Sequence, residues 1–142
     1  MTKHTSSSGI NLPFMVGLSK KLGIRGLIAS RTIKKHEIIE RCPVLLSPIK
    51  DDQYLTKTVM NKYYYEWNSR YTAIAIGYGG LINHSFEPNA RYCFNYRTRE
   101  LIFKALRAID PGEEILINYN YLPNSKEQVR PELVDYNSHD PT

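Results

Sequence analysis

Short apolar runs separated by turn residues fill the first third of the chain. Phe14–Leu18 and Leu27–Ala29 are apolar enough to predict two strands, and Gly23–Gly26 between them is typical of a turn. After a polar turn, Ile38–Leu46 predicts a longer strand. Pro43 lies inside it. Because proline has no N–H to donate to a sheet ladder, it marks either an interruption or an edge position.

The middle of the chain begins with a helix signal and continues with strand signals. Asp51 or Asp52 is placed to cap a short helix through Tyr54–Asn61, because aspartate accepts hydrogen bonds from the first turn of a helix. Tyr63–Trp67 is aromatic and Thr72–Ile76 is β-branched or small, so both are expected to be extended.

Turn and hairpin signals dominate the rest of the chain. Gly77–Gly80 breaks any regular element, and 81–90 holds too many Asn, Ser and Pro residues for a strand interior. Asp110–Gly112 is a strong turn sequence. Further strands are predicted over 91–96 and 100–105, joined as a hairpin, and over 115–119. Many short strands with closely spaced turns predict a mostly β domain.

The composition favours one soluble intracellular domain. The chain has 142 residues, of which 42% are hydrophobic, enough to bury one core. Residues 1–11 are polar and lack the apolar centre of a secretory signal, so we expect a flexible tail and a location in the cytoplasm or nucleus. No apolar run approaches the roughly 18 residues of a membrane span. Cys42 and Cys93 are far apart, which favours free thiols over a disulfide or a zinc site.

Charge alone leaves several classes of partner open. The net charge is +5, but the basic residues are scattered and form no long run. This excess is compatible with nucleic acid, with acidic complexes such as chromatin or ribosomes, and with a role in solubility only.

Three motifs define the candidate chemistry. Asn83–Asn89 reads NHSFEPN, Gly112–Ile115 reads GEEI with Tyr119 four residues further on, and Gly23–Ala29 is a glycine turn leading into a strand. Together and in this order they resemble the SET family of protein-lysine methyltransferases, over roughly 14–121. The likeness is greatest to compact stand-alone SET proteins of bacteria and large DNA viruses, which share the aromatic segment Tyr63–Tyr65 and a Gly-aromatic-Gly sequence like that at 77–79.

The resemblance implies a fold and domain boundaries. The expected fold is mostly β: several small β-sheets, few short helices, and a knot-like C-terminal arrangement in which the GEExxxxY segment passes by the NHSxxPN segment. The SET domain is expected over 12–122, after the tail 1–11 and before a C-terminal extension, 123–142.

The implied reaction moves a methyl group from S-adenosylmethionine to the side-chain amine of a lysine in a protein or peptide. A free lysine has a pKa of about 10.4, so deprotonating it near neutral pH costs roughly 4 to 5 kcal/mol, and a nearby cation in a dry channel lowers that cost. What remains is positioning. By resemblance, Tyr119 is the catalytic residue that orients the amine and the methyl group. For an average tyrosine, a surface strand position is the more common reading.

The resemblance also implies a donor site. Asn83 and His84 match the pair that holds the donor, although an Asn-His-Ser-x-x-Pro-Asn loop can also be held by its own side chains. The turn at 23–26 would bring backbone amides near the donor's carboxylate. Its residues are Gly23, Ile24, Arg25 and Gly26, and Ile24 stands where relatives often have glycine.

Aromatic residues are candidate walls of a lysine channel. Tyr63 and Tyr121 are equally balanced between channel wall and ordinary packing, whereas an aromatic core is favoured for Tyr65, Trp67 and Tyr78. Ile117, two residues before Tyr119, stands where relatives carry Phe or Tyr that affects how many methyl groups are added.

No metal site is expected. Many SET relatives have a cysteine-rich zinc segment after the last motif, but no cysteine follows Cys93 here. The extension would have to close the channel in another way, with Leu133 or Tyr136 as candidate lid residues, or leave closure to a partner subunit. Glu113 and Glu114 are adjacent in a strand and point to opposite faces, so we expect structural roles for both.

The candidate substrates are histones, ribosomal proteins and other basic proteins, and a homodimer stays open. Two other functions compete with the enzyme. A SET-like module could bind a peptide or nucleic acid without transferring a methyl group, and a small basic β-barrel could stack its 11 tyrosines on bases. The second gives no reason for the ordered motifs.

Overall fold

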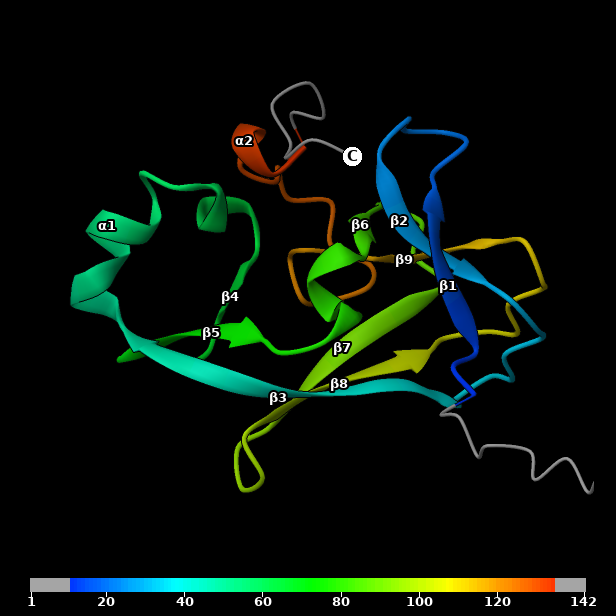
Figure 1. Cartoon of the computed structure of the whole chain (residues 1–142), viewed down its shortest axis with the longest axis horizontal. Coiled ribbons are helices and arrows are strands. Elements are labelled where there is room, and N and C mark those ends of the chain that lie inside the picture. The colour runs from blue at the N-terminus through cyan, green and yellow to red at the C-terminus, as the bar shows by residue number, and fades with distance from the viewer. Residues whose placement is uncertain (1–10, 135–142) are drawn as a thin grey trace, which may run out of the picture.

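The computed structural model describes residues 11–134, and strands dominate them (Figure 1). A four-stranded sheet lies at one end, in the order β1-β2-β9-β6. It comprises β1 (Phe14–Leu18), β2 (Arg25–Ala29), β9 (Glu114–Ile117) and the two-residue β6 (Asn83–His84). β1, β2 and β9 confirm the strands predicted there. β6 falls in a segment that the composition predicts to be irregular, so that prediction is wrong for these two residues.

The second sheet has five strands in the order β4-β5-β3-β8-β7. Its strands are β3 (Ile38–Pro48), β4 (Tyr64–Glu66), β5 (Tyr71–Ala75), β7 (Ala90–Asn95) and β8 (Glu100–Ala105). β7 and β8 form the predicted hairpin, with Ala90 opposite Ala105 and Asn95 opposite Glu100. Figure 1 shows β3 running along the molecule and linking the β4–β5 region with the β7–β8 hairpin.

Pro43 does not interrupt β3, which continues to Pro48, but it lies at a local edge, because the ladder with β5 begins only at Val44. β3 is the central strand, and it changes partner at Pro43: residues 38–43 pair with β8, and residues 44–48 pair with β5. The Val44 N–H donates to the Arg99 carbonyl on one side, and the Pro43 carbonyl accepts from Ile76 on the other. The missing N–H of Pro43 thus faces the side where the pairing with β5 has just ended.

The helices are short, and the helix predicted over 54–61 is divided. The 3-10 helix η1 (Ile49–Asp51) leads into α1 (Asp52–Leu55), and the 3-10 helix η2 (Val59–Lys62) follows. Asp51 makes no side-chain cap; instead Thr58 accepts from the Met60 N–H at the start of η2. Two further short helices are the 3-10 helix η3 (Tyr78–Leu81) and α2 (Pro131–Val134).

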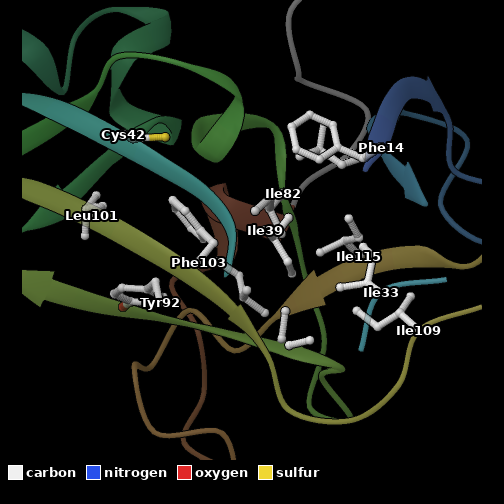
Figure 2. Close-up of a cluster of buried hydrophobic side chains, with 14 of the residues drawn as sticks. Phe14, Ile33, Ile39, Cys42, Ile82, Tyr92, Leu101, Phe103, Ile109 and Ile115 are labelled. Carbon is white, nitrogen blue, oxygen red and sulfur yellow. The ribbon is translucent and has the colours of Figure 1, made fainter. Parts of the chain in front are cut away.

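The core lies between the two sheets (Figure 2). Phe103 is fully buried and packs with Ile39 and Ile82, while Ile33, Ile109 and Ile115 fill the end near β1 and β2. Trp67 is buried as predicted. Tyr78 is 39% exposed, so its predicted place in the core is wrong.

The cysteines and the turn at 110–112 agree with the predictions. Cys42 is buried and Cys93 partly buried, and both are free thiols, as predicted. The turn at Asp110–Gly112 is confirmed by a hydrogen bond from the Glu113 N–H to the Asp110 carbonyl, and Gly112 has φ 87°, a left-handed conformation that favours glycine. Across residues 11–134, no helix has the length and apolar character to cross a bilayer.

Candidate active site

The two main motifs meet where β6 and β9 pair. These strands run parallel, with Asn83 opposite Leu116 and His84 opposite Ile117. The Ser85 N–H continues the contact by donating to the Ile117 carbonyl over 2.9 Å. β9 is thereby inserted between β2 and β6, so the NHSFEPN segment lies directly beside the strand that leads to Tyr119.

Asn89 fixes this crossing through its side-chain amide. Its Nδ2 donates to the Glu114 carbonyl at 2.8 Å, and its Oδ1 accepts from the Leu116 N–H at 2.9 Å. The amide therefore does for β9 what a neighbouring strand would do. Asn89 is 3% exposed, so water cannot replace these bonds. Its partners belong to β9 and not to its own loop, in contrast to the local capping considered for this sequence.

Asn83 and Glu114 form a buried polar cluster beneath the first motif. Asn83 Nδ2 donates to the Arg25 carbonyl at 2.9 Å and to Glu114 Oε1 at 2.8 Å. Ser19 Oγ donates to Glu114 Oε2 at 2.5 Å. A side chain at Gly26 would collide with both Glu114 Oε1 and Asn83 Nδ2. Glycine is required there because the cluster occupies the space of a Cβ atom.

The turn between β1 and β2 begins earlier than predicted. It spans Ser19 to Ile24, closed by the Ser19 N–H donating to the Ile24 carbonyl at 2.7 Å. Gly23 adopts φ 73° within it. Arg25 and Gly26 already belong to β2, opposite Leu18 and Gly17. The side chain of Ile24 is buried, so its departure from glycine serves packing.

His84 connects the first motif to Tyr119. Its Nδ1 accepts a hydrogen bond from the Tyr119 N–H at 3.1 Å, which places the proton of the neutral ring on Nε2. The ring packs against Phe86 and Tyr119, with centroid distances of 4.6 and 5.1 Å. Burial lowers the pKa of His84 below its ordinary value, so the ring is neutral near pH 7. Within residues 11–134, the buried Nε2 has no hydrogen-bond partner.

Tyr119 is held at three points. The His84 ring accepts from its N–H, Tyr92 donates to its carbonyl at 3.1 Å, and its own hydroxyl donates to the Ile82 carbonyl at 2.9 Å. Tyr119 is half-buried. A hydroxyl that donates to a fixed carbonyl has its proton direction set, and its oxygen can then act as an acceptor.

A cavity of about 390 Å³ opens beside this hydroxyl. Its wall contains six tyrosines and two acidic residues, together with basic and apolar groups. The lining residues are Lys62, Tyr63, Tyr64, Tyr65, Glu66, Gly80, Ile82, Tyr92, Phe94, Tyr119, Asn120, Tyr121, Glu127, Gln128, Val129, Arg130 and Leu133.

The structure brings some of the predicted site residues to this cavity and not others. Tyr119, Tyr63 and Tyr121 line it together. Ile117 does not: it is completely buried in the core. Asn83, His84 and the residues at 23–26 lie outside the cavity lining, around the buried cluster and the first turn. The residues predicted to bind the methyl donor and those predicted to line the lysine channel thus lie in two neighbouring regions. The contact between His84 and Tyr119 connects these regions.

The sequence did not predict Tyr92 as a site residue, and it predicted Tyr65 as a core residue. Tyr65 packs in the core and also reaches the cavity. Tyr92 lies on β7, and the alternation of side chains along that strand is the signal that could have placed it on the same face as Phe94. The Tyr65 and Tyr92 rings meet edge to face at 5.0 Å, and burial raises the pKa of Tyr92 so that its hydroxyl stays protonated.

Tyr121 is fixed by stacking despite its unusual backbone. It has φ 72°, a conformation that costs a non-glycine residue about 1 kcal/mol or more. Its ring stacks on Phe94 at 5.5 Å and meets Tyr92 at 5.4 Å, while the Arg91 guanidinium lies 5.6 Å from its centroid. These contacts hold the ring in the cavity wall.

The chain after Tyr121 forms part of the cavity wall. Asn118 Nδ2 donates to the Ser125 carbonyl at 2.8 Å, and Asn120 Nδ2 donates to the Glu127 carbonyl at 2.7 Å. Val129 is buried beyond these bonds, and Leu133 of α2 lines the cavity. Leu133 thus lies in the cavity wall, and its role as a lid residue stays a prediction. The other candidate, Tyr136, lies outside the described residues.

The adjacent glutamates lie apart, as predicted. Glu113 pairs with Arg107 at 3.0 Å and accepts from the Asp110 N–H, whereas Glu114 belongs to the cluster of Ser19 and Asn83. The side chains described between 11 and 134 contain no group of three histidines, cysteines or acids placed to hold a metal ion.

The fold and the site together define a class of protein: a small β domain in which an NHSxxPN segment runs beside a GEExxxxY strand and a tyrosine at the end of that strand faces a cavity. The SET-domain family model matches residues 24–120, and the chain belongs to that family. The expectation of a SET fold is confirmed. The likeness to bacterial and viral members stays a prediction.

Two comparisons give relatives. A histone-lysine N-methyltransferase of Schizosaccharomyces pombe, H3 lysine-37 specific, is 33% identical over 96 residues, which cover 67% of this chain and 65% of that protein. This chain therefore matches slightly less than two thirds of that relative's length. A crystal structure of a Plasmodium falciparum protein, described as a candidate histone methyltransferase, is similar with a TM-score of 0.61 and 34% identity, covering 77% of this chain and 98% of that one.

Proposed function

We propose that this protein is a protein-lysine N-methyltransferase that transfers a methyl group from S-adenosylmethionine to the side-chain amine of a lysine. The observation that carries the proposal is Tyr119. Its hydroxyl is oriented by the Ile82 carbonyl, its backbone is fixed by His84, and it faces a cavity with aromatic walls. A catalytically silent module would have no need of this arrangement.

The cavity fits a lysine side chain. The faces of Tyr63 and Tyr121 suit an alkyl stem and a cationic or methylated amine. The tyrosine-lined wall partly buries an entering amine and so lowers its pKa, because burial disfavours the charged form. The proton leaves to water, and the hydroxyl oxygen of Tyr119 then accepts from the neutral amine and directs its lone pair.

The donor's region follows from the buried groups beside the cavity. When bound, S-adenosylmethionine supplies an electrophilic methyl group on a sulfonium cation. His84 Nε2 is a buried N–H without a partner among the described residues, which fits an acceptor atom of a bound molecule. We propose that Asn83 and His84 border the donor site, and that the backbone at Gly23, Ile24, Arg25 and Gly26 completes it. Asn83 would act mainly by shaping β6, since its amide is already used in the buried cluster.

The substrate class follows from the relatives and the cavity. We propose a histone or another basic protein as substrate, in the nucleus or cytoplasm, because the S. pombe relative is a histone-lysine enzyme. Incubation of this protein with labelled donor and either histones or cell lysate, followed by mass spectrometry, identifies the modified lysine. The degree of methylation and the existence of a homodimer are separate measurements.

The domain boundaries remain proposals too. We place the SET domain over 12–122 and the extension over 123–142, of which 123–134 is described. Val129 and Leu133 line the cavity, which supports the extension as the part that closes the lysine channel.

The test of the function compares Tyr119→Phe with Tyr121→Phe. Removing the Tyr119 hydroxyl keeps the ring, so we expect single-turnover methyl transfer to fall ~10²- to 10³-fold while donor affinity changes much less. Tyr121→Phe is expected to change how many methyl groups are added more than the first transfer.

Two outcomes would reject the proposal. Calorimetry at high protein concentration that shows no binding of S-adenosylmethionine or its demethylated product would exclude the enzyme. Donor binding without transfer to any lysine would favour a silent binding module. A Tyr119→Phe protein with the full transfer rate would remove this residue from the mechanism.

A further inference from the structure

One side of the cavity is formed by η3 and the residue that follows it. Gly80 and Ile82 line the cavity. Two cavity tyrosines direct their hydroxyls at carbonyls of this segment: Tyr65 donates to Gly79 and Tyr119 donates to Ile82, each over 2.9 Å. The directions of both hydroxyls therefore depend on where the segment 78–82 lies.

Glu40, on β3, holds the beginning of this segment. Its two carboxylate oxygens lie 3.2 and 3.1 Å from the Tyr78 backbone nitrogen, whose N–H they accept. The Cys42 thiol donates to the same carboxylate at 3.1 Å. Burial, followed by the bond to Glu40, raises the pKa of Cys42 to about 12. The thiol thus stays protonated and orients the carboxylate toward Tyr78.

η3 packs closely on the core and on Glu40. A side chain at Gly79 would collide with the Phe103 ring, which lies fully buried in the core. A Cβ at Gly77, which has φ 138°, would lie 3.0 Å from Glu40 Oε1 and 3.1 Å from Cys42 Sγ. η3 is thus seated directly on β3 and β8, with Glu40 at its first residue.

We infer that Glu40 is a positioning residue for methyl transfer. By holding Tyr78, it fixes the position of the Gly79 and Ile82 carbonyls. These carbonyls in turn orient the hydroxyls of Tyr65 and Tyr119. Glu40 is not among the residues that line the cavity and would touch neither donor nor lysine. This inference rests on the proposed function, because it assigns Glu40 a role in the same reaction.

The variants are Glu40→Ala and Glu40→Gln. Glu40→Ala removes the acceptor, so the start of η3 loosens and the turnover number falls about tenfold or more, since small misplacements of reacting groups are costly. Donor affinity is expected to fall much less than the turnover number, because Asn83 and His84 are held separately by their pairing with β9. Glu40→Gln keeps one oxygen for the Tyr78 N–H and recovers most of the rate.

Glu37→Ala is the matched control. The Glu37 carboxylate also accepts a backbone N–H, that of Lys34 at 3.1 Å, and pairs with Arg31 at 2.7 Å, but it belongs to a turn outside the cavity wall. The Glu37→Ala variant also removes a carboxylate that accepts a backbone N–H, close to β3. The turnover number of this variant is expected to stay near that of the wild type.

Two readouts keep the tests separate. Hydrogen exchange followed by mass spectrometry reports the segment 77–83 without any need for activity, and faster exchange in Glu40→Ala supports the anchoring role. Unchanged exchange in this segment overturns the inference. Faster exchange with full turnover overturns the positioning role. A wild-type protein that methylates nothing rejects the proposed function, and the exchange result still decides whether Glu40 anchors η3.

Discussion

At the residue scale, position 26 shows how closely the first motif is packed against the second. Gly26 lies on β2, where Asn83 and Glu114 fill the space that a side chain would need. Its backbone conformation does not require glycine, since its φ is not among the positive values of this chain. The constraint is the close approach of the buried polar cluster.

Gly26→Ala is therefore expected to destabilise the fold by roughly 1–3 kcal/mol, the typical cost of forcing an extra methyl group into a packed interior. It also separates Asn83 from Glu114. Gly80→Ala is the control, since its Cβ would lie 3.8 Å from Tyr63, an ordinary contact. Chemical denaturation gives the free energy of unfolding for both. Equal stability of the two variants would show that the cluster yields easily.

At the scale of elements, the segment after β9 is attached to the domain by side chains of the strand's own continuation. Asn118 is 2% exposed, and its amide is satisfied by the Ser125 carbonyl. Val129 is 7% exposed. The segment 123–130 is thus held against the SET domain by these contacts.

Two truncations test whether the segment after Leu122 contributes to stability. Ending the chain after Leu122 leaves the Asn118 amide without its partner and exposes the site of Val129, at a cost of about 3 kcal/mol. Ending it after Val134 keeps every contact described above and is expected to leave the free energy of unfolding nearly unchanged. Thermal and denaturant unfolding of both proteins provide the measurement. Equal stability of the two would assign the segment to catalysis alone.

The sequence was informative about elements wherever pattern and turn chemistry agreed. The hairpin of β7 and β8 and the turn at 110–112 were predictable, because alternation and turn residues both mark them. β6 was not predictable, because a strand of two residues has no periodicity. It exists only through its pairing with β9, in which Asn83 lies opposite Leu116, 33 residues further along the chain. The exact place of Pro43 could not be predicted for a related reason: it depends on where the two different neighbours of β3 begin and end their pairing.

Some residues of the candidate site were predictable from the sequence and others were not. Tyr119, Asn83 and His84 were found because they belong to ordered motifs. Tyr92 and Val129 carry no motif, and only the fold brings them to the cavity. Glu40 likewise acts through a contact with Tyr78, 38 residues away, which no local pattern records.

At the scale of the whole molecule, His84 links stability to pH. Burial lowers its pKa in the folded protein below the ordinary value of 6.5. The unfolded chain therefore binds a proton more readily than the folded one, and stability is complete above about pH 6.5 and declines as the pH falls below it. Protonation would also remove the acceptor for the Tyr119 N–H.

The free energy of unfolding is expected to fall as the pH drops below about 6.5 in the wild type and to vary less in His84→Gln. His36→Gln serves as the control, because His36 is exposed. The carboxylates of Glu37 and Glu113, whose pKa values are lowered by Arg31 and Arg107, lose their contribution only below about pH 4.5, so the loss due to His84 begins at a higher pH than the loss due to these carboxylates. Parallel curves for wild type and His84→Gln would contradict the assignment.

The insertion of β9 between β2 and β6 has a consequence for synthesis of the chain. A ribosome delivers β2 and β6 long before residues 114–117, and until those residues emerge the two strands have no partner between them. A nascent chain can build the hairpins of β1 with β2 and of β7 with β8, since these are local. It cannot assemble the crossing that places Tyr119 beside His84. That crossing can form only after residues 114–117 have been synthesised and have paired with both β2 and β6.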